Sequence, residues 1–212
     1  MKLYTIPAGQ RLYRICTDKY PSNAFNSGNG GAYRFSPLFD GEGNVIPSMY
    51  LGVTHTEAMA ETLFRQEEGE RRRFDIAKIE KKKLVHLDVE HDLVLLDLQS
   101  IGKIAGLLEQ GKSAYPKLHR VAATLLALPQ LSHIHGFIWD SYQRKASGVG
   151  AMRVMVLYET RVNPPVLTER LSEYLLHPTG FNKLEDVSRA LNCDIPESVK
   201  NLANEISRKS VR

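Results

Sequence analysis

The stretch GGAYRFSPLFDGEGNVIPSMYLGVTHTEAMAETLF, residues 30–64, decides how this chain folds. Residues 32–37 around Arg34 predict a strand that enters a turn at a proline. An Asp-Gly pair marks the turn itself, and residues 45–53 predict the returning strand, with Tyr50 near its centre. The pattern therefore places a cation and an aromatic ring on consecutive elements.

A helix start follows directly. Thr54 and Glu57 have the spacing of a capping box, in which the hydroxyl binds the amide of the third helical residue and the carboxylate reaches back. The predicted helix runs to about Glu68. Its buried stripe is expected to contain Ala58, Met59, Leu63 and Phe64. Glu61 lies beside that stripe, where a carboxylate can point into a cleft.

Upstream, another arginine lies in an apolar segment. Residues 12–16 predict a strand that carries Arg14, and a polar, glycine-containing loop follows over residues 17–31. Because a guanidinium is always charged and costly to bury unpaired, Arg14 and Arg34 are expected to have partners. A planar fork of donors suits phosphate, so two such arginines can clamp a pyrophosphate.

Downstream, residues 65–83 mix both charge signs and indicate a solvated surface with a basic excess. Beyond them, apolar patterns predict strands at 84–87, 93–98, 134–139 and 152–158, and helices at 100–110 and 115–128. Ser141 follows the strand at 134–139. Two or three amphipathic helices are expected after residue 165, with no chemistry of their own.

Composition indicates a soluble globular protein, with one domain as the first expectation. The chain has 212 residues, 42% hydrophobic and 25% charged, which suffices for a core without disulfides. A net charge of +4 suits an anionic ligand but does not by itself argue for nucleic acid. Two distant cysteines, Cys16 and Cys193, favour a reducing cytoplasm. We expect no signal peptide and no membrane span.

The sequence lacks the motifs of several common enzyme classes. There is no GxGxxG after a strand, no Walker loop, and no GxSxG around Ser141. His133 and His135 form an H-x-H on a predicted strand, but no third ligand is obvious, so no metal is expected. Taken singly, Glu61 is typical of a surface helix, and Tyr50 of a core or edge strand.

The joint order of these residues resembles the RES domain family, which is named for its arginine, glutamate and serine. The similarity lies in LYRI with Arg14, RFSP with Arg34, IPSMYLG with Tyr50, THTEAMAETLF with Glu61 and GFIWDSYQ with Ser141. It covers roughly residues 10–160. Many members have proline before the serine, where this chain has Asp140.

The resemblance implies an α+β fold of the ADP-ribosyltransferase type: a split antiparallel β-sheet core of two small sheets, with flanking helices and NAD in the cleft. Residues 1–164 would form this domain, and residues 165–212 a helical extension packed on it. It also implies an enzyme that consumes NAD as its substrate by cleaving the nicotinamide–ribose bond, through hydrolysis or phosphorolysis. A protein ADP-ribosyltransferase remains open as an alternative, as does a non-enzymatic basic module that binds an anion or nucleic acid.

The resemblance also assigns roles. Glu61 would stabilise the charge that develops on the ribose. Arg14 and Arg34 would hold the pyrophosphate. Tyr50 would flank the nicotinamide, and Ser141 would bind its ribose or orient Glu61. Because the best known members are toxins, a helix-turn-helix antitoxin of the Xre type is the expected partner, in the cytoplasm, without membrane contact or direct nucleic-acid binding.

Overall fold

An eight-stranded sheet runs through the part of the chain that this computed structural model describes, residues 1–28, 31–64, 74, 79–144, 152–162 and 165–210. In spatial order its strands are β1 (Lys2–Ile6), β7 (Leu93–Asp97), β8 (Gly136–Asp140), β9 (Arg153–Tyr158), β5 (Ser48–Gly52), β2 (Arg11–Thr17), β6 (Lys82–Val89) and β10 (Leu167–Tyr174). Two short strands, β3 (Leu38–Phe39) and β4 (Val45–Ile46), form a separate hairpin.

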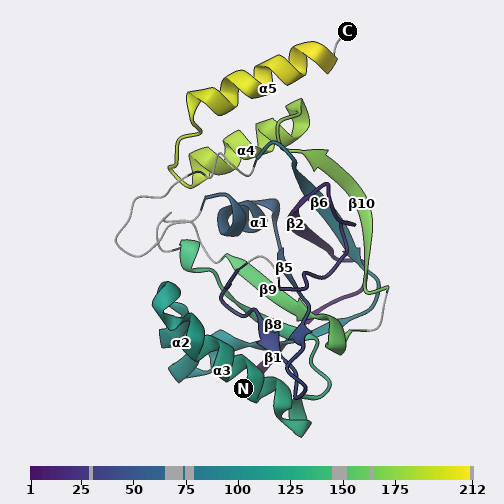
Figure 1. The fold of residues 1–212 in the computed structure, drawn as a ribbon, viewed down its shortest axis with the longest axis vertical. Coiled ribbons are helices and arrows are strands. Elements are labelled where there is room, and N and C mark those ends of the chain that lie inside the picture. Colours follow the sequence, from purple (N-terminus) through teal and green to yellow (C-terminus); the bar gives the residue numbers. More distant parts are fainter. Residues whose placement is uncertain (29–30, 65–73, 75–78, 145–151, 163–164, 211–212) are drawn as a thin grey trace.

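The large sheet is almost divided between β2 and β5. These strands share one register pair, Tyr13 with Gly52, whereas β2 pairs with β6, and β5 with β9, along their whole lengths. The two half-sheets are therefore β1-β7-β8-β9-β5 and β2-β6-β10 (Figure 1). The expected split α+β core is confirmed, with two differences: the halves are joined in one curled sheet, and β7 and β8 are parallel.

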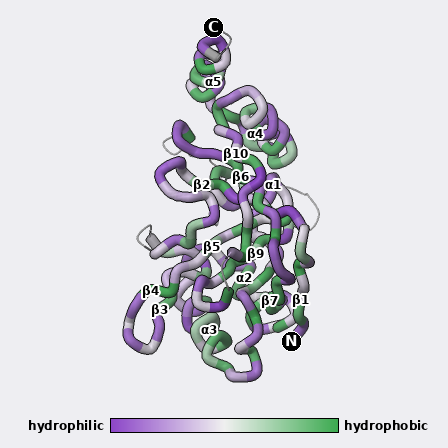
Figure 2. Tube along the Cα trace, turned by 90° about the vertical axis from the view of Figure 1, so that its right-hand side faces the viewer, coloured by the Kyte–Doolittle hydropathy of each residue, from purple (hydrophilic) through white to green (hydrophobic). Residues whose placement is uncertain are grey.

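Apolar cores hold the layers together. Side chains from both halves, such as Leu12 and Leu95, meet in the core enclosed by the curl. The outer face of the larger half packs against two helices, α2 (Gly102–Leu108) and α3 (Tyr115–Ala127). The outer face of the smaller half is covered by α1 (His55–Thr62) and α4 (Pro178–Ala190), and α5 (Glu197–Ser210) packs on α4 (Figure 1). In Figure 2, α4 and α5 mix hydrophilic and hydrophobic stretches, as amphipathic helices do.

The capping box predicted at the start of α1 is present. The Thr54 hydroxyl accepts from the amide of Glu57 at 3.4 Å, and the Glu57 carboxylate accepts from the amide of Thr54 at 2.6 Å. The predicted stripe is buried: Ala58, Met59, Leu63 and Phe64. α1 ends at Thr62, earlier than predicted, and residues 65–68 of the predicted helix lie outside the described residues.

One predicted element is wrong, and the strands β1, β3 and β10 were not predicted. Residues 32–37 form a tight turn instead of a strand, because the Tyr33 amide bonds to the Ser36 carbonyl at 2.7 Å and reverses the chain. The C-terminal segment begins with the edge strand β10, which pairs with β6, before its helices. Short 3-10 turns connect other elements: η2 (Leu98–Ser100), η3 (Lys112–Ala114), η4 (Pro129–Leu131), η5 (Tyr142–Arg144) and η6 (Glu159–Arg161).

Candidate active site in the split of the sheet

A pocket opens where β2 and β5 separate. Arg14 lines it from β2 and Tyr50 from β5, while Glu57 and Glu61 reach it from α1. Gly52 makes this arrangement possible, because a Cβ there would lie 2.6 Å from the backbone of α1. The structure therefore brings three of the predicted site residues, Arg14, Tyr50 and Glu61, to one pocket.

The guanidinium of Arg14 is tied to the loop that follows β2. Its Nη1 donates to the carbonyl oxygens of Ser22, at 3.0 Å, and Ala24, at 2.6 Å. Burial lowers the pKa of Arg14, since the charged form loses solvation. In the described part of the chain no carboxylate forms an ion pair with it. A partly buried cation with neutral partners is suited to bind an anion.

Glu61 is held by Ser141, which follows β8. The Ser141 hydroxyl donates to Oε1 of Glu61 and accepts from the amide of Gln143 at 3.0 Å. The Ser141 amide donates to the carbonyl of Met152 at 2.8 Å. Ser141 is 2% exposed, so its position is set on all sides by protein. Two residues predicted for the site thus touch, although one comes from a helix and the other from a distant strand end.

Both the hydroxyl and the ring of Tyr50 are held by neighbouring residues. Its hydroxyl accepts from the amide of Phe35 at 2.8 Å. Its ring meets Trp139 edge-on, with 6.3 Å between ring centroids, and lies 5.9 Å from the ring of Tyr33. These contacts leave the remaining surface of Tyr50 to form an aromatic wall of the pocket.

Arg34 does not line this pocket, and its hydrogen bonds in the described part of the chain, unlike that of Ser141 to Glu61, join it to residues outside the predicted site. Its Nη1 donates to the carbonyl oxygens of Leu108, at 3.0 Å, and Gln110, at 3.4 Å. The guanidinium lies 5.6 Å from the centre of the Tyr115 ring, and Arg34 is 8% exposed. Because the last carbonyls of a helix lack partners within the helix, Arg34 caps the end of α2.

Glu57 is a pocket residue that the sequence indicated only as a helix cap. Its Oε2 binds the Thr54 amide, and its Oε1 accepts from the amide of Arg153 at 2.6 Å. Burial raises the pKa of Glu57, and the hydrogen bonds from these amides partly offset the effect. The available signal was its place four residues before Glu61, which puts both carboxylates on one face of the helix.

His135, from the H-x-H pair, and His119 both contact backbone groups. His135 Nδ1 accepts from the amide of Val94 at 2.9 Å, and burial lowers the pKa of His135. His119 Nε2 lies 2.6 Å from the carbonyl oxygen of Tyr33. Among the described residues, no group of three metal-ligating side chains could hold a metal ion. No helix in the same part of the chain is long and apolar enough to cross a membrane.

The curled, split sheet with a cation, an aromatic ring and a serine-bound carboxylate at the split defines an α+β protein with a candidate ligand site between its half-sheets. Residues 11–180 match the family model of the RES domain, so the chain belongs to the RES domain family. The match extends past residue 160, where the resemblance in the sequence ended, and it includes β10.

One solved structure with a similar fold is the M. tuberculosis MbcT–MbcA toxin–antitoxin complex. The TM-score is 0.53 at 19% identity, over 80% of this chain and 85% of that chain. At this identity the likeness concerns the fold alone. No curated protein matches the chain.

Proposed function

We propose that this protein cleaves the bond between nicotinamide and ribose in NAD and acts as the toxin of a toxin–antitoxin pair. The observation that carries the proposal is the Glu61 carboxylate, held by the buried Ser141 in a pocket that Arg14 also lines. Membership of the RES domain family and a fold similar to that of a toxin–antitoxin complex support it.

Glu61 would supply the charge that the reaction needs. When the C–N bond breaks, its electron pair leaves with the nicotinamide, which departs as a neutral amide, and the ribose gains oxocarbenium character. A fixed carboxylate next to the ribose stabilises that positive charge. Ser141 holds the carboxylate in one orientation, so little reorganisation is required as the charge develops. Water or phosphate then bonds to the ribose carbon.

Arg14 and Tyr50 would hold the two ends of the reacting half of NAD. Both line the same pocket, Arg14 from β2 and Tyr50 from β5. The nicotinamide and its ribose would occupy this pocket, with the phosphates beside Arg14. Tyr50 would flank the nicotinamide ring.

For Arg34, the observed contacts favour a supporting role over direct contact with a phosphate. Arg34 holds the turn at residues 33–36 against the end of α2. The same turn carries the Phe35 amide, which binds the Tyr50 hydroxyl. Arg34 would thus stabilise the aromatic wall of the site from behind.

The partner we propose is a helix-turn-helix antitoxin that covers the pocket, since unrestrained NAD cleavage would deplete the cell. We place the reaction in the cytoplasm, which suits the two buried free thiols, Cys16 and Cys193. Residues 165–212 would act as part of the same unit as 1–164. The pairing of β10 with β6 and the packing of α4 and α5 in the core around α1 support this view.

The substitution Glu61→Gln tests the proposal. It removes the negative charge, while the amide oxygen can still accept the hydrogen bond from Ser141. Purified wild type incubated with NAD should release nicotinamide, and E61Q should do so at least about 100-fold more slowly. A matched control, Glu205→Gln, changes an exposed glutamate on α5 and should leave the rate unchanged.

The products separate the alternatives. Free ADP-ribose or its 1-phosphate would identify water or phosphate as acceptor, whereas label transferred from NAD to a protein band would favour a protein ADP-ribosyltransferase. No nicotinamide release by wild type, with and without phosphate, would contradict the enzyme. Salt-sensitive binding to DNA or RNA that E61Q does not affect would then favour the basic binding module.

A further inference from the structure

Arg153, the first residue of β9, binds the beginning of α1 through its backbone. Its amide donates to Oε1 of Glu57 at 2.6 Å, and its carbonyl accepts from the amide of Val53 at 3.2 Å. Both polar groups of its backbone are thus tied to the first turn of α1 and the segment before it. The start of this helix is therefore fixed to the first residue of β9, the strand beside β5 in the larger half-sheet.

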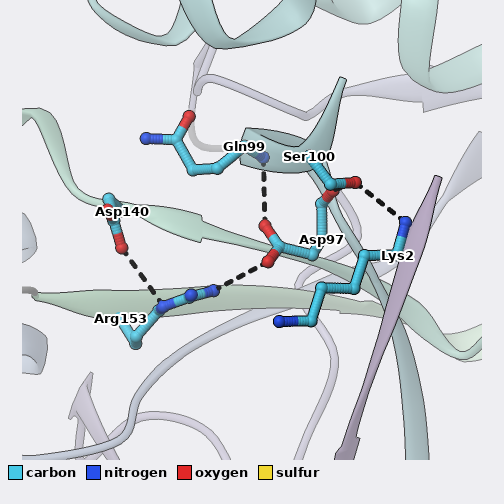
Figure 3. Close-up of polar contacts among 6 residues, drawn as sticks. All are labelled: Lys2, Asp97, Gln99, Ser100, Asp140 and Arg153. Atoms are coloured by element: carbon cyan, nitrogen blue, oxygen red, sulfur yellow. Dashed lines mark hydrogen bonds and ion pairs between the residues drawn. The ribbon is translucent and has the colours of Figure 1, made fainter. Parts of the chain in front are cut away.

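The side chain of Arg153 binds the ends of two further strands (Figure 3). Its Nε lies 3.2 Å from a carboxylate oxygen of Asp140, and its Nη1 lies 3.4 Å from one of Asp97. The guanidinium also lies 5.5 Å from the centre of the Tyr4 ring. Asp97 ends β7 and Asp140 ends β8, so one arginine joins both strand ends to β9.

Further contacts link Arg153 to the Glu61 carboxylate. Asp140 directly precedes Ser141, and the Ser141 amide donates to the carbonyl of Met152, the residue before Arg153, at 2.8 Å. The Ser141 hydroxyl then binds Glu61, one helical turn after Glu57. Together the contacts form a closed ring. The Glu57 carboxylate binds the Arg153 amide, the preceding residue Met152 binds the Ser141 amide, the Ser141 hydroxyl binds Glu61, and α1 joins Glu61 back to Glu57.

We propose that Glu57 and Arg153 are positioning residues that fix the spacing between Glu61 and Ser141. Both carboxylate oxygens of Glu57 are occupied by backbone amides, so Glu57 acts through Glu61 and not on the substrate. A displacement of about 1 Å at a reacting group can lower the rate about 100-fold. Because the ring fixes both turns of α1 relative to Ser141, we expect it to affect kcat. The catalytic consequence rests on the proposed function, whereas the ring itself can be tested without substrate.

The substitution Glu57→Gln weakens the ring. One carboxylate oxygen becomes an NH2 group, which cannot accept a hydrogen bond, so one of the two amides loses its acceptor and the bond to the other loses its charge. We expect kcat for nicotinamide release to fall about 10- to 100-fold, with KM changed less than about twofold. Measurements belong at a temperature at which the variant is fully folded.

Thr54→Ala is the matched control, because it removes the other half of the same helix cap and leaves the bond between Glu57 and Arg153 in place. It should lower the melting temperature by about 2–4 °C and leave kcat unchanged. If T54A and E57Q reduce kcat equally, the effect belongs to the helix cap and the proposal is overturned.

Two further measurements separate positioning from general damage. In a Ser141→Ala background, E57Q should have little additional effect on kcat, because the spacing that it disturbs no longer matters. Hydrogen exchange at the amides of Arg153 and Ser141 should be about tenfold faster in E57Q than in wild type and unchanged in T54A. The exchange result needs no NAD, so it stands even if the proposed activity fails.

The proposal would be overturned if the double variant lost kcat by the product of the two single losses, E57Q and S141A. It would also be overturned if hydrogen exchange at the Arg153 and Ser141 amides were the same in E57Q as in wild type. Should E57Q not fold, Arg153→Lys examines the side-chain contacts that hold Asp140, the residue before Ser141, because lysine keeps the charge but cannot span Asp97 and Asp140 with a planar fork. R153K is expected to accelerate exchange at the Ser141 amide and to lower kcat. Wild-type values for both would reject the positioning role.

Discussion

The region around Arg14 and the region around Arg34 contain the same kind of side chain in opposite settings. Arg14 lies where two strands separate, lines a pocket, and donates to two loop carbonyls. Arg34 lies in a closed turn, caps a helix, and stacks near an aromatic ring. Both occur in apolar segments, and both were expected to hold the pyrophosphate of NAD.

The difference between them teaches what makes a buried arginine available to a ligand. Neither has a carboxylate partner among the contacts that the structure describes. The carbonyls that Arg34 binds end a helix and carry its partial negative charge, so the cation is partly neutralised within the fold. Arg14 binds only the carbonyls of a loop beside an open pocket, where an anion can approach.

Among the substitutions that bear on this comparison, the largest effect is expected at Arg14. Arg14→Ala should lower kcat/KM for NAD by about 30- to 100-fold, mostly through KM, because a charged contact worth about 2–3 kcal/mol is lost. Steady-state kinetics of nicotinamide release measures this. Arg11→Ala, which removes an exposed arginine from the same strand, is the control and should leave KM unchanged. Equal KM values for R14A and R11A would end the distinction between a ligand-binding and a structural arginine.

A second substitution tests the structural role of Arg34. Arg34→Ala should lower the free energy of unfolding by about 2–3 kcal/mol, because two carbonyls at the end of α2 lose a charged donor. KM for NAD should change less than about threefold. Urea unfolding and the same kinetic assay give both numbers. A rise in KM as large as that of R14A would instead assign Arg34 to a phosphate, as the family resemblance implied.

The smallest effect is expected at Tyr50, which links the two regions. Tyr50→Phe removes the acceptor for the Phe35 amide and should lower the free energy of unfolding by about 1 kcal/mol. The ring stays in place, so turnover should fall only a few-fold. Tyr20→Phe, at an exposed tyrosine, should change neither quantity. Loss of turnover comparable to R14A would mean that the hydroxyl itself contacts the substrate.

Features that depend on neighbouring residues were predictable from the sequence. The capping box of Thr54 and Glu57 is a local hydrogen-bond pattern, and the buried stripe of α1 follows from helical spacing. The strands β6 to β9 contain dense apolar runs and were found with shifted ends. The split core and the family could be predicted only from the joint order of several residues. Each of these residues taken alone was equally compatible with a structural role.

Features that depend on distant partners were not predictable. β10 reads LTERLSEY, an exposed edge strand whose alternating charges resemble a helix surface as much as a strand. The turn around Arg34 was taken for a strand, since its closure depends on one backbone hydrogen bond and its side chain on the end of α2. The contact of Glu57 with the Arg153 amide joins two parts of the chain that no local pattern relates.

The way the chain alternates between the half-sheets has a consequence for synthesis on the ribosome. β1 belongs to one half, β2 to the other, β5 to the first again, β6 to the second, and β10 completes the second half at Tyr174. Neither half is a continuous piece of chain, so neither can be finished early. A nascent chain must therefore be translated through β10 before its sheet has all its strands.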